Sequence, residues 1–163
     1  MDLIIRKKKI KDNRMDFKGM DSLYFLIGLL SEFVNRLQTR GDTFFEEISW
    51  KQCFLMICIN LFEEPPTLKE LSEAAGSSHQ NVKQMLLKLE KAGFVEMTAD
   101  PEDKRKQRVV CTEKMREFDE KYERPSDAFI KKIYQNVDPG EVEITIRTIL
   151  RMDENLKEEA SCG

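Results

Sequence analysis

Apolar residues recur along this chain at the three- and four-residue steps of an α-helix. The first such segment ends at Gly41 and carries one apolar seam, formed by Met20, Leu23, Ile27, Leu30, Val34 and Leu37. Heptad spacing of this kind is typical of a helix that packs along another helix. Residues 48–62 are apolar on nearly all sides, and this pattern predicts a buried central helix.

Short polar signals mark where the next helices begin and end. Ser49 with Gln52, and Thr67 with Glu70, have the spacing of capping boxes, which satisfy the first amides of a helix. Two consecutive prolines end the central helix, because proline breaks the backbone hydrogen-bond ladder. Gly76 fits the left-handed position past the end of a short helix. The segment therefore predicts two helices joined by a tight glycine turn.

A hairpin follows the second of these helices. Residues 94–97 and 108–111 have the composition of strands, and residues 100–106 between them combine turn-forming and charged residues. Two helices, a tight turn and a hairpin make a winged helix-turn-helix. The predicted fold is mostly α with a small β-hairpin wing, and residues 48–112 form the expected DNA-binding domain.

The remaining segments carry more apolar surface than a winged helix of this size needs. Residues 19–47 form one amphipathic helix, and residues 113–163 form further long helices, with a kink or split expected at Pro125. Their apolar faces are interpreted as a dimerisation region, since a two-fold dimer brings the two DNA-recognition helices, one from each subunit, to successive major grooves. A second layer of the same core is the alternative. Residues 1–18 hold seven basic and three acidic residues and are expected to form a flexible arm.

Charge and composition narrow the class of protein. The net charge of −3 argues against indiscriminate binding of polyanions, although the local potential, more than the total, governs phosphate contact. His79 is the only histidine, and the four cysteines form no C-x-x-C pair, so a metal site or cofactor is not expected. Without a glycine-rich phosphate loop or a nucleophile elbow, an enzyme is disfavoured.

No signal peptide or membrane segment is evident. The apolar run Leu23–Leu30 is far shorter than the ~20 residues that a membrane span needs. A cytoplasmic location with reduced thiols is the expectation.

Two groups of residues are candidates for DNA contact. Serine and amide side chains suit phosphate oxygens and adenine edges, and lysine and arginine suit phosphate, guanine or a narrow minor groove. A merely solvated helix face, and a turn whose acids cancel its bases, are the alternatives. On the second helix, which Ser77 or Ser78 caps, the candidates are Ser77, Ser78, Gln80, Asn81, Lys83, Gln84 and Lys88. On the wing they are Lys104, Arg105, Lys106 and Arg108.

Several stretches, in order and at these spacings, resemble the MarR family of bacterial transcription regulators over about residues 20–158. The matching stretches are Ile48-Ser49-x-x-Gln52, Thr67-Leu68-Lys69-Glu70-Leu71, Leu89-Glu90-Lys91-x-Gly93-Phe94-Val95, Asp100-Pro101-x-Asp103-x-Arg105 and Val109-x-x-Thr112.

The resemblance implies a function and several partners. Family members are dimers that bind near-palindromic operators in double-stranded DNA and usually repress, and many are released by small phenolic or lipophilic ligands or by thiol oxidation. It also implies that Asp103 braces arginines near the wing. An effector pocket between the dimer helices and the winged domain is expected to be lined by Tyr24, Phe25, Trp50 and Phe54, although aromatics at this spacing also suit a core.

Departures from the family pattern leave alternatives open. Gln84 stands where arginine is common on the reading helix, Cys53 where an aromatic is usual, and Met115 where a glycine is frequent. The first departure suggests a different operator. A thiol-based redox regulator and a winged helix that binds another protein remain the alternative functions.

Overall fold

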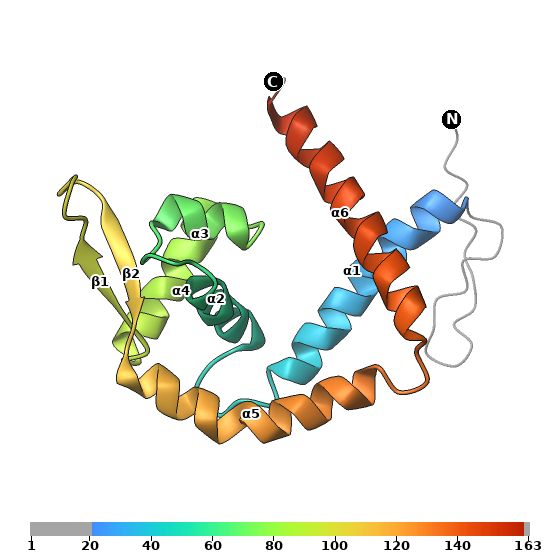
Figure 1. Ribbon diagram of the computed structural model, residues 1–163, viewed down its shortest axis with the longest axis horizontal. Helices are drawn as coiled ribbons and strands as arrows, with labels where there is room; N and C mark the ends of the chain where they lie inside the picture. The colour runs from blue at the N-terminus through green and yellow to red at the C-terminus, as the bar shows by residue number, and fades with distance from the viewer. Residues whose placement is uncertain (1–20, 162–163) are drawn as a thin grey trace. The chain divides into compact units, whose positions relative to one another are not determined.

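The computed structural model describes residues 21–161, and the predicted arm at residues 1–18 lies outside them. Contacts divide the chain into two compact units, residues 1–113 and 114–163. The described residues contain six helices and one two-stranded antiparallel sheet, as expected for a winged helix-turn-helix (Figure 1). In chain order these are α1 (Ser22–Gly41), α2 (Trp50–Asn60), α3 (Leu68–Ala74), α4 (His79–Lys91), β1 (Val95–Ala99), β2 (Gln107–Cys111), α5 (Glu113–Ile133) and α6 (Pro139–Ser161).

The helices of the first unit begin where their capping residues predict. Ser49 and Gln52 form a complete capping box at the start of α2, and Thr67 and Glu70 form another at the start of α3. Each box satisfies two backbone amides that have no partner within the helix. These local interactions fix where the two helices begin.

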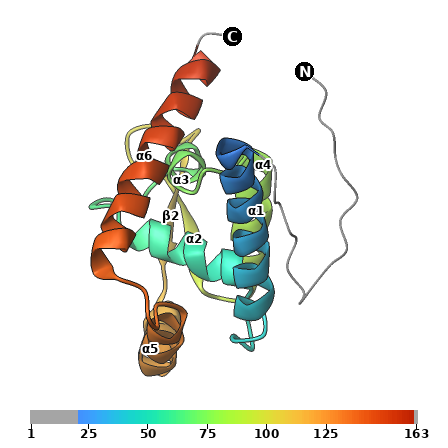
Figure 2. The same ribbon diagram turned by 90° about the vertical axis from the view of Figure 1, so that its right-hand side faces the viewer.

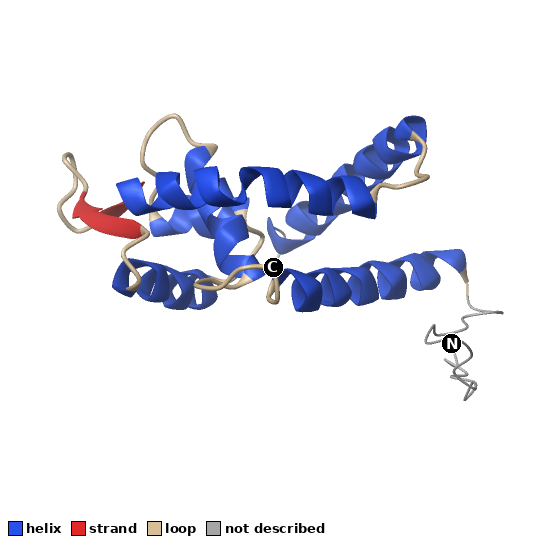
Figure 3. Ribbon diagram, turned by 90° about the horizontal axis from the view of Figure 1, so that it is seen from below, coloured by secondary structure: helices blue, strands red, loops and turns tan. Residues whose placement is uncertain are grey.

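The core of the first unit lies where α2, α3, α4 and the hairpin meet. Phe94 and four leucines of these helices are fully buried there: Leu55, Leu71, Leu86 and Leu89. Figure 1 shows the hairpin projecting from this group of helices, and Figure 3 shows that strands occur only in the hairpin. The packed helices therefore form a fixed base from which the hairpin extends.

The expectation that the central helix is buried on nearly all sides is wrong. Within the first unit α2 is contacted by α1, α3, α4 and β2, and these neighbours bury Leu55, Met56, Cys58 and Ile59. Phe54, Ile57 and Leu61 are exposed on a different face. The apolar pattern of the sequence therefore does not distinguish the buried face of α2 from its exposed face.

The hairpin has one register along its whole length. Val95 pairs with Cys111 and Ala99 pairs with Gln107, so both strands are slightly longer than predicted. Met97 lies opposite Val109, and Val109 is buried. The strands alternate between a face on the core and a face in solvent, which is the pattern of a sheet with one covered side.

Helix α1 exposes most of its apolar side chains. Gly41, at its end, is its only buried residue. Leu23 is 72% exposed and Ile27 is 53% exposed, and both belong to the predicted seam. A second exposed stripe, formed by Phe25, Leu29 and Phe33 at four-residue steps, was not predicted. Figure 2 shows that α1 and α2 run in different directions, so α2 meets α1 over a short length only.

The second unit consists of α6 and nearly all of α5. Of the kink or split expected at Pro125, the split does not occur: α5 continues through this proline as one helix. A proline removes a single amide donor, and the hydrogen bonds of the flanking turns persist. The helix α6 begins at Pro139, where Asp138 accepts hydrogen bonds from the amides of Gly140 and Glu141 as predicted. None of residues 139–157 of α6 is buried, and Ile144, Ile146, Ile149, Leu150 and Leu156 are all exposed.

Candidate nucleic-acid interface

The helix α4 has one buried face and one polar face. Val82, Leu86 and Leu89 are buried against the rest of the first unit. At 100° per residue, Gln80, Gln84, Leu87 and Lys91 fall within an arc of about 60° on the opposite side. The exposed residues of α4 are His79, Gln80, Asn81, Lys83, Gln84, Leu87, Lys88 and Lys91. Five predicted contacts, Gln80, Asn81, Lys83, Gln84 and Lys88, are therefore exposed to a partner.

The start of α4 is a closed network of hydrogen bonds. Gly76 has a φ of 57° and turns the chain from α3 into α4. Ser78 is the capping residue, and its hydroxyl accepts a hydrogen bond from the amide of Asn81. The Asn81 side-chain amide donates to the Ser77 hydroxyl over 2.8 Å. The predicted serine contacts thus also hold the turn and cap the helix.

A buried carboxylate braces the base of the wing. Asp100 is 3% exposed, and its Oδ1 accepts hydrogen bonds from the amides of Glu102 and Asp103. Its Oδ2 accepts a bond of 2.6 Å from Nε of Arg108. The two backbone amides are the main cause that lowers the pKa of Asp100, and Arg108 adds to the effect. The carboxylate therefore stays ionised and holds the turn through which the chain reverses.

The same arginine joins the wing to the loop between α2 and α3. The Arg108 guanidinium donates from Nη1 to the Pro65 carbonyl over 2.8 Å, and the Val109 amide donates to the Pro66 carbonyl over 2.9 Å. Asp100 raises the pKa of Arg108 by its hydrogen bond and its charge. The structure thus places Arg108 in the framework of the wing, whereas the sequence suggested a DNA contact. The alternative interpretation, in which the acidic residues of the turn simply cancel its basic residues, does not describe this arrangement, because Asp100 pairs with Arg108 at the base of the wing.

The tip of the wing presents cations to solvent. The Arg105 side chain is 92% exposed, and Lys104 and Lys106 are exposed as well. Asp103 accepts hydrogen bonds from the amide and Nε of Arg105, at 3.1 and 3.3 Å, and its other oxygen lies 3.8 Å from Nζ of Lys106. These are contacts of an exposed group, so they orient Arg105 without burying it.

The structure also contains two residues of interest that sequence reasoning missed. Asp100 was counted among turn residues that offset the basic tip, and its position directly after a strand was the only signal of its bracing role. Leu87 was not considered, although it is 41% exposed in the middle of the outward stripe of α4. Helical-wheel arithmetic from the buried leucines would have found it.

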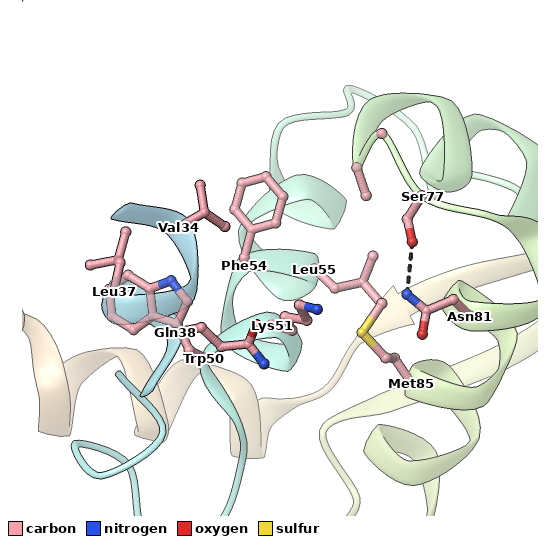
Figure 4. Close-up of a pocket in the computed structure, with 12 residues that line it drawn as sticks. Val34, Leu37, Gln38, Trp50, Lys51, Phe54, Leu55, Ser77, Asn81 and Met85 are labelled. Atoms are coloured by element: carbon pink, nitrogen blue, oxygen red, sulfur yellow. Dashed lines mark hydrogen bonds between the residues drawn. The ribbon is translucent and has the colours of Figure 1, made fainter. Parts of the chain in front are cut away.

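A pocket of about 360 Å³ lies within the first unit, between α1, α2 and the start of α4. Figure 4 shows the side chains around it, with Trp50 and Phe54 coming from α2 and the Asn81 amide directed at Ser77. The lining residues are Val34, Leu37, Gln38, Trp50, Lys51, Phe54, Leu55, Ala75, Gly76, Ser77, Asn81 and Met85. Trp50 and Phe54 were predicted to line such a pocket, whereas Tyr24 and Phe25, nearer the start of α1, do not line this one.

The wall of this pocket is held in place by Trp50. Its backbone amide donates to the Asp42 carboxylate over 2.7 Å, and its ring stacks with that of Phe45 at 6.0 Å. A Cβ atom on Gly41 would come within 2.2 Å of the indole ring. Glycine at the end of α1 therefore leaves the space that the indole occupies.

Residues 48–106 match the family model of the MarR family. The chain carries a MarR-family domain. Members of this family are transcription regulators and not enzymes. The matched residues of the MarR-family domain run from just before α2 to the tip of the wing, so they include every candidate DNA contact except Arg108.

Solved structures share the fold of the chain beyond the matched residues. A MarR protein from Peptoclostridium difficile is 24% identical, with a TM-score of 0.69, covering 90% of this chain and 95% of that one. S. aureus MepR in complex with DNA is 16% identical, with a TM-score of 0.70, over 84% and 99%. Bordetella bronchiseptica BpsR, whose DNA binding is regulated by 6-hydroxynicotinic acid, is 15% identical, with a TM-score of 0.69, over 86% and 97%. No curated protein matches the chain in sequence.

Two further features concern all the residues that the structure describes. Among residues 21–161, no helix has the length and apolar character required to cross a membrane, and no cluster of three potential metal ligands is found.

Cys58 is buried, and that burial raises the pKa of its thiol. A protonated, buried thiol reacts slowly with oxidants, so Cys58 is a packing residue. Cys53 and Cys111 are half-buried, and Cys162 lies outside the described residues.

Replacing Asp100 with asparagine is expected to loosen the wing of the MarR-family domain. Asparagine keeps an oxygen for the turn amides but loses the ion pair with Arg108. Because the folded-state pKa of Asp100 is lowered, its contribution to stability is present above about pH 4 and is lost as the pH falls through the folded value. Thermal unfolding of Asp100→Asn should occur a few degrees lower at pH 7, and the difference from wild type should shrink in acid.

The matched control for this prediction is Glu102→Gln, which removes one carboxylate of the same turn. Glu102 is exposed, so its charge should contribute little to stability. Equal melting temperatures for Asp100→Asn and wild type at pH 7 would contradict the bracing role.

Proposed function

We propose that this chain is a homodimeric, sequence-specific DNA-binding transcriptional regulator that represses its target genes. The observation that carries the proposal is the arrangement within the MarR-family domain. A helix with a polar outward face follows a tight turn, and a braced hairpin beside it holds an exposed arginine at its tip. The helix suits the major groove and the arginine suits the minor groove. The complex of MepR with DNA supports the same use of the shared fold.

The dimer is proposed from the apolar faces of α1 and α6. Exposed leucines, isoleucines and phenylalanines line both helices, and a helix of this kind gains stability mainly by burying its apolar face. A second copy of the chain can cover these faces and would bring two α4 helices to one duplex. The operator is then near-palindromic, with half-sites about 34–36 Å apart along the DNA.

The pocket is proposed to bind a small aromatic or phenolic effector that releases the protein from DNA. Its volume lies in the range of small-molecule sites, and its lining is largely apolar and aromatic, with Lys51 and Asn81 among the few polar groups. BpsR responds to an aromatic acid, which supports this ligand class. Asn81 belongs to α4, so an occupant can alter the helix that reads DNA.

Trp50 provides a direct test of the effector proposal, because it is the only tryptophan in the chain. Titration with 6-hydroxynicotinic acid and simple phenols is expected to change Trp50 fluorescence in a saturable manner for at least one compound and to weaken DNA binding by the same compound. In Gly41→Ala the added methyl displaces the indole, so the fluorescence response should be lost or weakened. Saturable binding that is the same in both proteins would place the ligand elsewhere.

The DNA-binding proposal is tested by selecting duplexes from a random pool with the full-length protein. We expect enrichment of a near-palindromic sequence whose affinity falls steeply with salt, as cationic contacts to phosphate require. Failure to enrich any sequence would favour the alternative, a winged helix that binds another protein.

A further inference from the structure

The outward stripe of α4, formed by Gln80, Gln84, Leu87 and Lys91, contains one apolar side chain, whereas a helix face that only contacts water is usually polar. Leu87 is 41% exposed, and on the helix it lies about 140° from the buried Val82 and about 160° from the buried Leu89. Its neighbours on the stripe are Gln84 and Lys91, which are polar and exposed. Leu87 therefore contributes little to the core, and its side chain is displayed on the surface proposed to enter the major groove.

The chemistry of this stripe favours one kind of base pair. Glutamine can pair with both the N6 and N7 positions of adenine in the major groove. Thymine, the partner of adenine, carries a 5-methyl group in that groove, and apolar side chains contact it. Arginine and lysine make the commonest contact to guanine; arginine is absent from residues 77–91, and lysine occurs on the stripe only at Lys91. Gln80 and Gln84 thus suit adenine, and a leucine between them and Lys91 suits the adjacent methyl group.

We propose that Leu87 is a specificity-determining residue that contacts the 5-methyl group of a thymine in each half-site. This inference rests on the proposed DNA-binding function and adds a base preference to it. Contact with the methyl group removes apolar surface of both partners from water, so it stabilises the complex with thymine. The same leucine gives no such gain opposite cytosine, whose edge carries an amino group and lacks the methyl.

The test separates the methyl group from every hydrogen bond of the base pair. The full-length protein first enriches a duplex from a random pool, and each thymine of that duplex is then replaced singly by deoxyuridine. Deoxyuridine lacks only the 5-methyl group. The affinity of each duplex is measured for wild type, for Leu87→Ala and for Leu61→Ala. Leu61, the residue that follows α2, is 79% exposed and is not part of the stripe, so its replacement is a matched change of leucine to alanine.

We expect one thymine per half-site at which loss of the methyl weakens wild-type binding by about fourfold, the factor for burying one methyl-sized group. Leu87→Ala should bind the thymine and deoxyuridine duplexes equally, whereas Leu61→Ala should keep the wild-type difference. Melting temperatures by circular dichroism check that both variants are folded. An enriched duplex with no sensitive thymine, or a sensitivity that survives Leu87→Ala, would overturn the role of Leu87 alone. Failure to enrich any duplex would overturn the DNA-binding function, and this inference with it.

Discussion

Ile27→Glu is expected to convert the protein to a monomer and to lower its affinity for a palindromic operator by about 100-fold or more. Ile27 is 53% exposed on the seam of α1, which the proposed dimer buries. A carboxylate there would lose its hydration without gaining a partner, and such burial is strongly unfavourable. The loss in affinity follows because a monomer forfeits the second half-site, and linked binding of two sites gains a factor of about 10² to 10⁴. Analytical ultracentrifugation and fluorescence anisotropy measure the two effects.

Thr39→Glu is the control for the dimer prediction. Thr39 is exposed on the same helix, on the side away from the seam, and its hydroxyl donates to the Asn35 carbonyl. This variant should remain a dimer. If Ile27→Glu sediments as wild type does, then the seam of α1 is not the subunit interface, and the exposed residues of α6 become the remaining candidates.

Arg105→Ala is expected to weaken operator binding by about tenfold for each wing while leaving the dimer intact. The Arg105 side chain is 92% exposed, and Asp103 orients it without covering it. Loss of a single well-placed arginine contact costs on the order of 1–3 kcal/mol, and a dimer loses two. The narrow minor groove concentrates negative potential, so a planar guanidinium inserted there contributes more than a surface charge does.

Arg105→Lys distinguishes insertion from simple charge attraction. Lysine keeps the charge but lacks the planar fork of donors. An affinity close to that of Arg105→Ala indicates insertion into the groove, and an affinity close to wild type indicates a phosphate contact. Arg105→Ala with wild-type affinity at physiological salt would remove the wing tip from the interface.

Local chemistry explains why much of the fold was predictable from the sequence. A capping box needs two residues three positions apart, and the boxes at Ser49 and Thr67 both form as expected. The start of α6 at Asp138 and Pro139 is equally local. Signals of this kind depend on neighbouring residues only, so they survive without knowledge of tertiary structure.

The features that were missed depend on residues far apart in the chain. The bond from Arg108 to the Pro65 carbonyl spans 43 positions, so no sequence pattern showed that this arginine supports the wing. The pocket lies beside the second half of α1, at Val34 and Leu37, which excludes the earlier Tyr24 and Phe25. The exposed face of α2 was mistaken for core because apolar periodicity does not distinguish burial within one chain from burial at an interface.

The hydrogen bond between Asn81 and Ser77 has a consequence for how this regulator can diverge. Both residues line the pocket, and both stand at the front of α4. A substitution at Asn81 therefore changes the cavity wall and the reading surface in a single step. Under the proposed function, a substitution at Asn81 that changes effector specificity also changes the DNA sequence that is recognised. Among relatives, substitutions that alter effector specificity alone are therefore expected on the opposite wall of the pocket, at Val34, Leu37 and Phe54.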